Sequence, residues 1–272
     1  MRTTFGLMAT RTSGVLGQLD EDLAFALSMA DAADAITMDR FGSPSLHVQT
    51  KDDLTPVTDA DRSTEELLRS LIDAHRPADA ILGEEYGSTD SANARQWIVD
   101  PIDGTKNYLR GVPVWATLIA LSIDGIPAVG VVSAPALGRR WWAATGSGAW
   151  RSIAAGTAEQ IHVSRVESPA EASFSFSDAQ GWRAGQLDRL LHATARQRAY
   201  GDFWSHMLVA EGAVDIAAEP VLGTWDMAAL IPIVQEAGGR ATAFDGGDPI
   251  ASSSLLVTNG ALHTAAMELL HS

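Results

Sequence analysis

The sequence predicts an α+β fold, with helices and an antiparallel sheet in the first half and alternating strands and helices after about Gly146. Apolar residues recur at helical spacing from Asp20 to Phe41, and again from about Ser63 to the break before Pro77. Strand candidates follow, and Asp124-Gly125 predicts a hairpin between two of them. We therefore divide the chain into three parts: a loose N-terminal extension (1–18), an α+β half (19–146) and an α/β half (147–272).

Each predicted element carries its own start or stop signal. Acidic residues at 20–22 favour the N-terminus of the first helix, and Gly42-Ser43-Pro44 ends it. A late helix from about Met227 to Glu236 closes at a Gly-Gly pair, and Pro232 should kink its first turns. The other expected elements are strands near 97–100, 117–123, 128–133, 139–144, 174–176, 240–244 and 255–258, and helices near 185–196, 203–211 and the C-terminus.

Composition describes a globular protein and excludes several classes of site. With 272 residues, 46% of them apolar, the chain can bury a full core. It has no cysteine, which excludes disulfides, thiolate metal sites and a cysteine nucleophile and fits a reducing cytoplasm. Residues 1–18 hold only a broken apolar run, and no stretch reaches the ~20 apolar residues of a membrane span. We expect a cytoplasmic protein with no membrane partner.

The net charge of −15 argues against nucleic acid as a partner. Phosphate backbones are bound by clustered Lys and Arg, and the chain shows no such cluster. Most of the acidic residues are best explained as a solvated surface. If the substrate is an anion, bound divalent metals could supply the local positive charge.

The most informative segment is Asp100-Pro101-Ile102-Asp103-Gly104-Thr105. An apolar strand ends on Asp100, turns at Pro101 and presents a second carboxylate at Asp103. Carboxylates this close repel each other unless a cation lies between them, and hard oxygen ligands suit Mg²⁺ or Mn²⁺. If Gly104 and Thr105 open a helical turn, their backbone N–H groups would face phosphate oxygens, and the Thr105 hydroxyl is suited to orient a water molecule.

Acidic residues in four distant segments could contribute to one site: Asp59 and Asp61, Glu84 and Glu85, Asp100 and Asp103, and Asp226. Each alone has a structural explanation. Asp61 and Asp226 could cap helices, and Glu84-Glu85 could form a solvated turn. For Asp59 and Glu85 we favour a purely structural role over a role in the site. Together, the carboxylates are what metal-assisted phosphoryl transfer requires.

Three motifs resemble signatures of the inositol monophosphatase family, which are Mg²⁺-dependent, lithium-sensitive phosphatases. They are Gly83-Glu84-Glu85, the Asp100 to Thr105 segment, and Trp225-Asp226 with Glu236 to Gly239 downstream. The similarity runs in order from about Leu19 to the C-terminus. It implies a layered αβαβα sandwich of the inositol monophosphatase and sugar phosphatase type, two or three Mg²⁺ ions per site with Mn²⁺ as a possible substitute, and commonly a homodimer.

The same resemblance implies a set of metal ligands. Glu84, Asp100 and the Ile102 carbonyl would bind one ion, and Asp100, Asp103 and Asp226 a second. A third, weaker ion would lie near Glu84. The half of the chain from 19 to 146 would then be the metal-binding half, and the second half would contribute Asp226 and the substrate pocket.

Catalytic and phosphate-binding roles are also implied by the family. Asp61 and Thr105 would position the attacking water, with Glu84 at the third ion. Gly104 and Thr105 would contact the phosphate.

The alcohol half of the substrate should be selected by the second half of the chain, around Asp202-Phe203-Trp204. A carboxylate flanked by aromatic surface suits a cationic or imidazole group better than a polyol. The alternative is that Phe203 and Trp204 are core residues of a helix.

Five longer segments resemble the histidinol-phosphatase branch of the family. That similarity implies hydrolysis of L-histidinol phosphate in histidine biosynthesis, with Asp202 and Glu219 binding the imidazole and amino groups and Tyr200, Gly201 and Phe203 beside them. Trp204 and Pro232 depart from the pattern of the branch. The segments are 100–107, 110–116, 131–136, 139–144 and 198–203.

Other functions remain open. The same chemistry could act on inositol 1-phosphate or on many esters. Asp59-Ala60-Asp61-Arg62-Ser63 superficially resembles the nucleophile motif of haloacid-dehalogenase-type phosphatases, but it follows a polar loop that contains a proline instead of an apolar strand. Seven scattered histidines give little support to a histidine-rich metal phosphatase. A non-catalytic module that binds metal and phosphate ligands is the last alternative.

Overall fold

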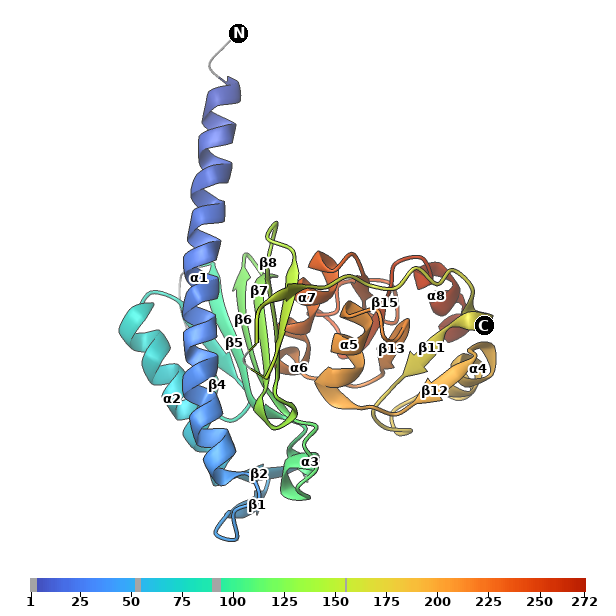
Figure 1. The fold of residues 1–272 in the computed structure, drawn as a ribbon, viewed down its shortest axis with the longest axis horizontal. Helices are drawn as coiled ribbons and strands as arrows, with labels where there is room; N and C mark the ends of the chain where they lie inside the picture. The colour runs from blue at the N-terminus through green and yellow to red at the C-terminus, as the bar shows by residue number, and fades with distance from the viewer. Residues whose placement is uncertain (1–3, 52–54, 90–93, 155) are drawn as a thin grey trace.

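The computed structural model describes residues 4–51, 55–89, 94–154 and 156–272, arranged in five alternating helical and sheet layers (Figure 1). The outer helices α1 (Thr4–Arg40) and α2 (Asp59–His75) cover one face of an eight-stranded sheet. Helices α5 (Asp202–Ala210), α6 (Thr224–Ala228) and α7 (Leu230–Glu236) separate it from a five-stranded sheet, whose other face carries α4 (Gln186–Ala193) and α8 (His263–His271). The expected αβαβα sandwich is confirmed.

The eight-stranded sheet is antiparallel throughout except for the pair β3 and β5. Asp124 and Gly125 both have positive φ, 53° and 81°, as the predicted hairpin between β6 and β7 requires. The strands in spatial order are β10 (Glu159–Gln160), β9 (Ala149–Ile153), β8 (Arg139–Ala144), β7 (Ile126–Ala134), β6 (Ala116–Ile123), β5 (Arg95–Asp103), β3 (Ala80–Gly83) and β4 (Gly87–Ser88).

The five-stranded sheet is mixed. Its strands in spatial order are β12 (Arg196–Arg198), β11 (Ser173–Ser175), β13 (Ile216–Glu219), β15 (Leu255–Thr258) and β14 (Arg240–Thr242). The first three run parallel and the last two pairings are antiparallel. A separate ribbon of β1 (Val48–Thr50) and β2 (Pro56–Thr58) leads into α2. Apolar side chains between the layers form the main cores.

Helix α1 begins at Thr4, so residues 4–18 are helical where we expected a loose extension. No proline interrupts residues 4–40, and a helix once nucleated lengthens at little cost per residue. The N-terminal part of α1 still projects beyond the sheet (Figure 1). None of the helices in the described ranges is long and apolar enough to cross a membrane.

Helix α2 begins at Asp59, ahead of the expected start near Ser63. Thr58 is its N-cap, and Asp61 closes a capping box by accepting hydrogen bonds from the Thr58 backbone N–H at 2.8 Å and hydroxyl at 2.5 Å. Asp61 therefore does cap a helix, but from inside its first turn.

The helix expected from Met227 to Glu236 is two helices in tandem, α6 and α7. Pro232 lies in the first turn of α7. Since it has no N–H to pair with the carbonyl four residues earlier, the helical ladder breaks where we expected only a kink. The break leaves Asp226 on a short helix of its own, facing the end of β5.

Candidate active site

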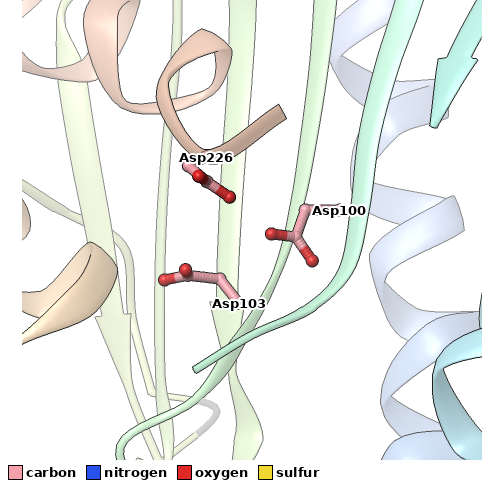
Figure 2. Close-up of side chains that lie close together, drawn as sticks. All are labelled: Asp100, Asp103 and Asp226. Atoms are coloured by element: carbon pink, nitrogen blue, oxygen red, sulfur yellow. The ribbon is translucent and has the colours of Figure 1, made fainter. Parts of the chain in front are cut away.

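The end of strand β5 presents two carboxylates to the same space. The register of β5 against β6 shifts between Asp100 and Asp103, and the Pro101 carbonyl at that irregularity accepts a 2.8 Å hydrogen bond from the Thr117 hydroxyl. The shift breaks the alternation of an ideal strand. Asp100 and Asp103 therefore lie on one side, as the sequence motif predicts (Figure 2).

Asp226 completes a cluster of three carboxylates. Its side chain is fixed by the Gly223 backbone N–H, which donates to Oδ2 at 2.7 Å. One carboxylate oxygen from each of Asp100, Asp103 and Asp226 lies within 4.8 Å of the others, and Figure 2 shows the three groups converging. An all-oxygen donor set of this kind fits Mg²⁺ or Mn²⁺ and not a zinc site.

The electrostatics of the cluster agree with a cation site. Burial, followed by the charges of neighbouring carboxylates, raises the pKa of Asp100 and of Asp103 well above the usual range. Burial also raises the pKa of Asp226 to about 7. A divalent cation among these groups would remove the repulsion and lower each pKa.

Glu84 lies at the edge of this cluster. Its charge contributes to the raised pKa of Asp100, but the three-carboxylate group does not include it. The Lys51 ammonium lies 2.8 Å from Glu84 Oε1 and 2.6 Å from Glu85 Oε1. Lys51 thus holds Glu84 beside the predicted metal ligands.

The turn that carries Glu84 is held by Glu65, a residue that the sequence analysis missed. Glu65 is fully buried in α2, and its carboxylate accepts a 2.7 Å hydrogen bond from the Glu85 backbone N–H. Arg69 pairs with the same carboxylate at 2.8 Å. The local sequence around Glu65 reads as an ordinary amphipathic helix, so only the tertiary structure reveals its role.

The prediction that Glu85 belongs to a solvated turn is wrong, whereas a structural role is supported for Asp59. The Glu85 side chain is only 4% exposed, and burial raises its pKa to about 7. It is therefore not part of a solvated turn. Asp59, by contrast, pairs with Arg40 at the end of α1.

Asp61 and Thr105 come together as predicted. Thr105 is the first residue of α3 (Thr105–Leu109). Its hydroxyl lies 3.4 Å from Asp61 Oδ1 and donates to the Ile102 carbonyl at 3.0 Å. Burial raises the pKa of Asp61 to about 6, against the lowering effect of its hydrogen bonds from Thr58.

A cavity of about 490 Å³ extends from the carboxylate cluster into the second half of the molecule. Asp103, Asp226, Asp202 and Glu219 are among the residues that line it. A cavity of this size can hold a small molecule.

The two pocket carboxylates, Asp202 and Glu219, are linked through Ser177. The Ser177 hydroxyl accepts a 2.6 Å hydrogen bond from the Asp202 backbone N–H and donates to Glu219 Oε1, also at 2.6 Å. Asn107 Nδ2 donates to Asp202 Oδ2 at 2.8 Å. The sequence analysis assigned no role to Ser177 or Asn107, because nothing local connects them to residues so far along the chain.

Burial dominates the protonation of both pocket carboxylates. It raises the pKa of Asp202 to about 6 and that of Glu219 to about 8. A cationic ligand would favour the ionised form of each.

Phe203 joins the pocket to the cluster. Its backbone N–H donates to Asp103 Oδ2 at 2.7 Å, and its ring packs against Trp141 in the core at 6.0 Å between centroids. Phe203 lines the cavity, as predicted. Its ring also packs in the core, as the alternative explanation of a helix core residue predicts.

Tyr200 and Gly201 are not among the residues that line the cavity. Tyr200 instead packs against Trp204 at 5.5 Å between ring centroids, and the Gly201 N–H donates to the Ser205 hydroxyl at 3.0 Å. The substrate contacts of these two residues stay a prediction.

The raised pKa values predict how the stability of the metal-free protein depends on pH. Glu219 and Asp226 bind protons more tightly in the folded than in the unfolded chain, so folding takes up protons below their folded pKa values of about 8 and about 7. Lowering the pH from 8.5 to 6.5 should therefore stabilise the metal-free protein, by up to about 1.4 kcal/mol per pH unit for each proton bound.

Urea unfolding in a chelator across this range measures the effect. The variant Glu219→Gln should show a shallower slope than the wild-type protein. Stability that falls between pH 8.5 and 6.5 would contradict the prediction. Below pH 6.5, Asp61 and Asp202, whose folded pKa values are about 6, take up further protons and extend the trend. The buried imidazole of His206, whose pKa is lowered to about 3 by burial, opposes it, because the ring stays neutral in the fold but protonates in the unfolded chain.

Comparison with known proteins agrees with the fold and the acidic motifs. The model of the inositol monophosphatase family matches residues 18–272. The chain is 54% identical to the histidinol-phosphatase of Mycobacterium tuberculosis over 255 residues, which cover 92% of this chain and 98% of that protein. It is 52% identical to the histidinol-phosphatase of Streptomyces coelicolor over 251 residues, 89% and 94% of the two chains.

Solved structures give the same result. The inositol monophosphatase from Anabaena superposes with a TM-score of 0.81 at 30% identity, over 93% of this chain and 96% of that one. The resemblance found from the sequence motifs is confirmed. The chain belongs to the inositol monophosphatase family and is a phosphatase.

Proposed function

We propose that the protein hydrolyses L-histidinol phosphate to L-histidinol and phosphate in a Mg²⁺-dependent reaction. The observation that carries this proposal is one cavity lined by two carboxylates of the cluster, Asp103 and Asp226, and by two further buried carboxylates, Asp202 and Glu219. The carboxylate cluster suits a metal-bound phosphate group, and the pair of Asp202 and Glu219 suits an alcohol that carries a cationic group. The names of the two histidinol-phosphatases with 54% and 52% identity support the same substrate.

Asp100, Asp103 and Asp226 would hold the metal, with Glu84 and the Ile102 carbonyl completing the ligand set. When bound, divalent ions lower the pKa of water and neutralise charge on the phosphoryl group. Asp61 and Thr105 would orient the attacking water, since the Thr105 hydroxyl already lies 3.4 Å from Asp61. The backbone of Gly104 and Thr105 would contact the phosphate.

Charge favours a nitrogen-containing alcohol over a polyol. Two carboxylates in a water-poor pocket are stabilised by a cation more than by neutral hydroxyl groups. An ammonium or imidazolium group between Asp202 and Glu219 would provide that cation. A homodimer in the cytoplasm that serves histidine biosynthesis remains a prediction from the resemblance.

A substrate panel tests the function. We expect kcat/KM for L-histidinol phosphate to exceed that for inositol 1-phosphate at least a hundredfold with Mg²⁺, and activity to disappear in EDTA. A preference for inositol 1-phosphate would favour the alternative substrate, and equal values would indicate a broad phosphatase. No turnover of any ester with Mg²⁺ or Mn²⁺ would favour the non-catalytic binding module.

Asp202→Ala tests the pocket. Removing this carboxylate should raise KM for L-histidinol phosphate by about ten- to a hundredfold, as expected for a lost charge-assisted contact. The value of kcat should change less, because the metal ligands remain. Asp188→Ala removes the same charge from the exposed surface of α4 and serves as the control. Unchanged KM in Asp202→Ala would remove Asp202 from the pocket.

A further inference from the structure

His206 of α5 is the buried polar side chain that the proposed mechanism does not use. The residue is only 1% exposed, and neither ring nitrogen has a hydrogen-bond partner within the described part of the chain. It is nonetheless one of the residues that line the 490 Å³ cavity. His206 therefore borders the space that would receive the substrate.

An imidazole in this position is costly if it serves only packing. Burial lowers the pKa of His206 to about 3, so the ring is neutral. A neutral imidazole has one N–H donor and one lone-pair acceptor. Buried polar atoms without partners destabilise a fold, whereas an apolar side chain of similar size would not.

His206 lines the same cavity as the pocket carboxylates Asp202 and Glu219. It lies four residues after Asp202, the first residue of α5, and Glu219 is the last residue of β13. Asp103, Asp178 and Asp226 also line the cavity. Besides those three carboxylates, Asp202, Glu219 and His206 can accept hydrogen bonds from N–H donors.

We infer that His206 binds the alcohol half of the substrate, with its neutral imidazole accepting a hydrogen bond from an N–H group of a nitrogen-containing phosphate ester. This inference rests on the proposed function and adds a specificity residue to it. The contact would pair a ring nitrogen that has no hydrogen-bond partner among the described residues. A phosphate ester whose alcohol half has no hydrogen-bond donor would gain nothing from it.

The matched variants are His206→Met and His206→Gln. Both side chains are flexible and of similar length, but only glutamine retains a donor and an acceptor. Each is assayed with L-histidinol phosphate and with phenyl phosphate, whose alcohol half has neither an N–H nor an O–H donor. Thermal unfolding of each variant verifies the fold.

His206→Met should raise KM for L-histidinol phosphate about tenfold, the loss expected for one hydrogen bond in a buried site. Its kcat should stay within about twofold, and KM for phenyl phosphate should not change. His206→Gln should recover much of the lost affinity. His206→Met should also be at least as thermostable as the wild-type protein, since it removes an unpaired polar group.

Three outcomes would overturn the inference. They are an unchanged KM for L-histidinol phosphate in His206→Met, an equal rise in KM for both esters, and a glutamine variant as impaired as the methionine variant. The proposed function is tested separately by the wild-type protein. A wild-type preference for L-histidinol phosphate that is undiminished in His206→Met would contradict only the role of His206.

Discussion

Asp103→Asn should abolish Mg²⁺-dependent turnover and leave the fold intact. Asp103 is one of the three converging carboxylates, and a neutral amide is a much poorer ligand for a hard divalent cation. Loss of the metal's stabilisation of the transition state should lower kcat/KM by about 10³-fold or more, roughly 4 kcal/mol. Steady-state kinetics with L-histidinol phosphate over a range of Mg²⁺ concentrations measures this loss.

The melting temperature of Asp103→Asn should respond to Mg²⁺ differently from that of the wild-type protein. The pKa of Asp103 is raised by burial and then by the charges of Asp202 and Asp226, so the metal-free variant escapes that repulsion and should melt at a higher temperature than the metal-free wild-type protein. Asparagine can still accept the 2.7 Å hydrogen bond from the Phe203 N–H. Mg²⁺ at about 100 times Kd should stabilise the wild-type protein by about 2.7 kcal/mol and the variant much less.

Asp73→Asn is the matched control, because it makes the same change on the exposed face of α2. It should retain both activity and the response to Mg²⁺. Near wild-type turnover in Asp103→Asn, or an equal rise in melting temperature with Mg²⁺, would refute the assignment of Asp103 as a metal ligand.

Gly104→Ala should damage both stability and activity. Gly104 has φ +84°, and a Cβ there would lie 2.8 Å from the Val114 carbonyl oxygen and 3.2 Å from Asp202 Oδ2. The left-handed conformation costs an alanine about 1 kcal/mol, and overpacking adds about 2 kcal/mol. We expect the melting temperature to fall by about 10 °C.

Activity should fall further than stability accounts for. Gly104 lies between Asp103 and Thr105, and the added methyl group would also press on Asp202 across the site. At a temperature where the variant is folded, kcat/KM should therefore drop by about a hundredfold or more, since small displacements of reacting groups are costly.

Gly111→Ala is the control for Gly104→Ala. Gly111 also has positive φ, +69°, but no atom lies within 4 Å of its added Cβ. Gly111→Ala should lose only the stability that the left-handed conformation costs an alanine, and it should keep its activity. If Gly104→Ala and Gly111→Ala behave alike, the close approach at Gly104 has no functional importance.

The elements predicted best are those with local signals. The Asp124-Gly125 hairpin has both residues at positive φ, and β8 and β15 have the expected bounds. The predictions failed at helix boundaries, where the Thr58–Asp61 capping box and the missing N–H of Pro232 acted differently from what we expected, and where α1 continues without a stop signal. Residues 4–18 are helical, α2 begins at Asp59, and Pro232 divides a helix instead of kinking it.

The residues of the candidate site also fall into those with a local sequence signal and those without one. Asp100 and Asp103 could be paired from the sequence because they lie three residues apart in one strand end. Lys51 and Glu65, which support Glu84 and its turn, carry no local signal. The error at Glu85 has the same origin, because burial of a turn depends on what packs over it.

The sequence by itself identified the family, the reaction class and the carboxylates of the candidate metal site, because one short segment holds the strand end, the turn and two of the predicted ligands. Only the tertiary structure decided what supports and lines the rest of the cavity. Ser177 between Asp202 and Glu219, Asn107 on Asp202, and the unpartnered ring of His206 all depend on contacts or burial set by packing between distant elements. Such distances and burial arise when the layers pack, and no local pattern of residues encodes them.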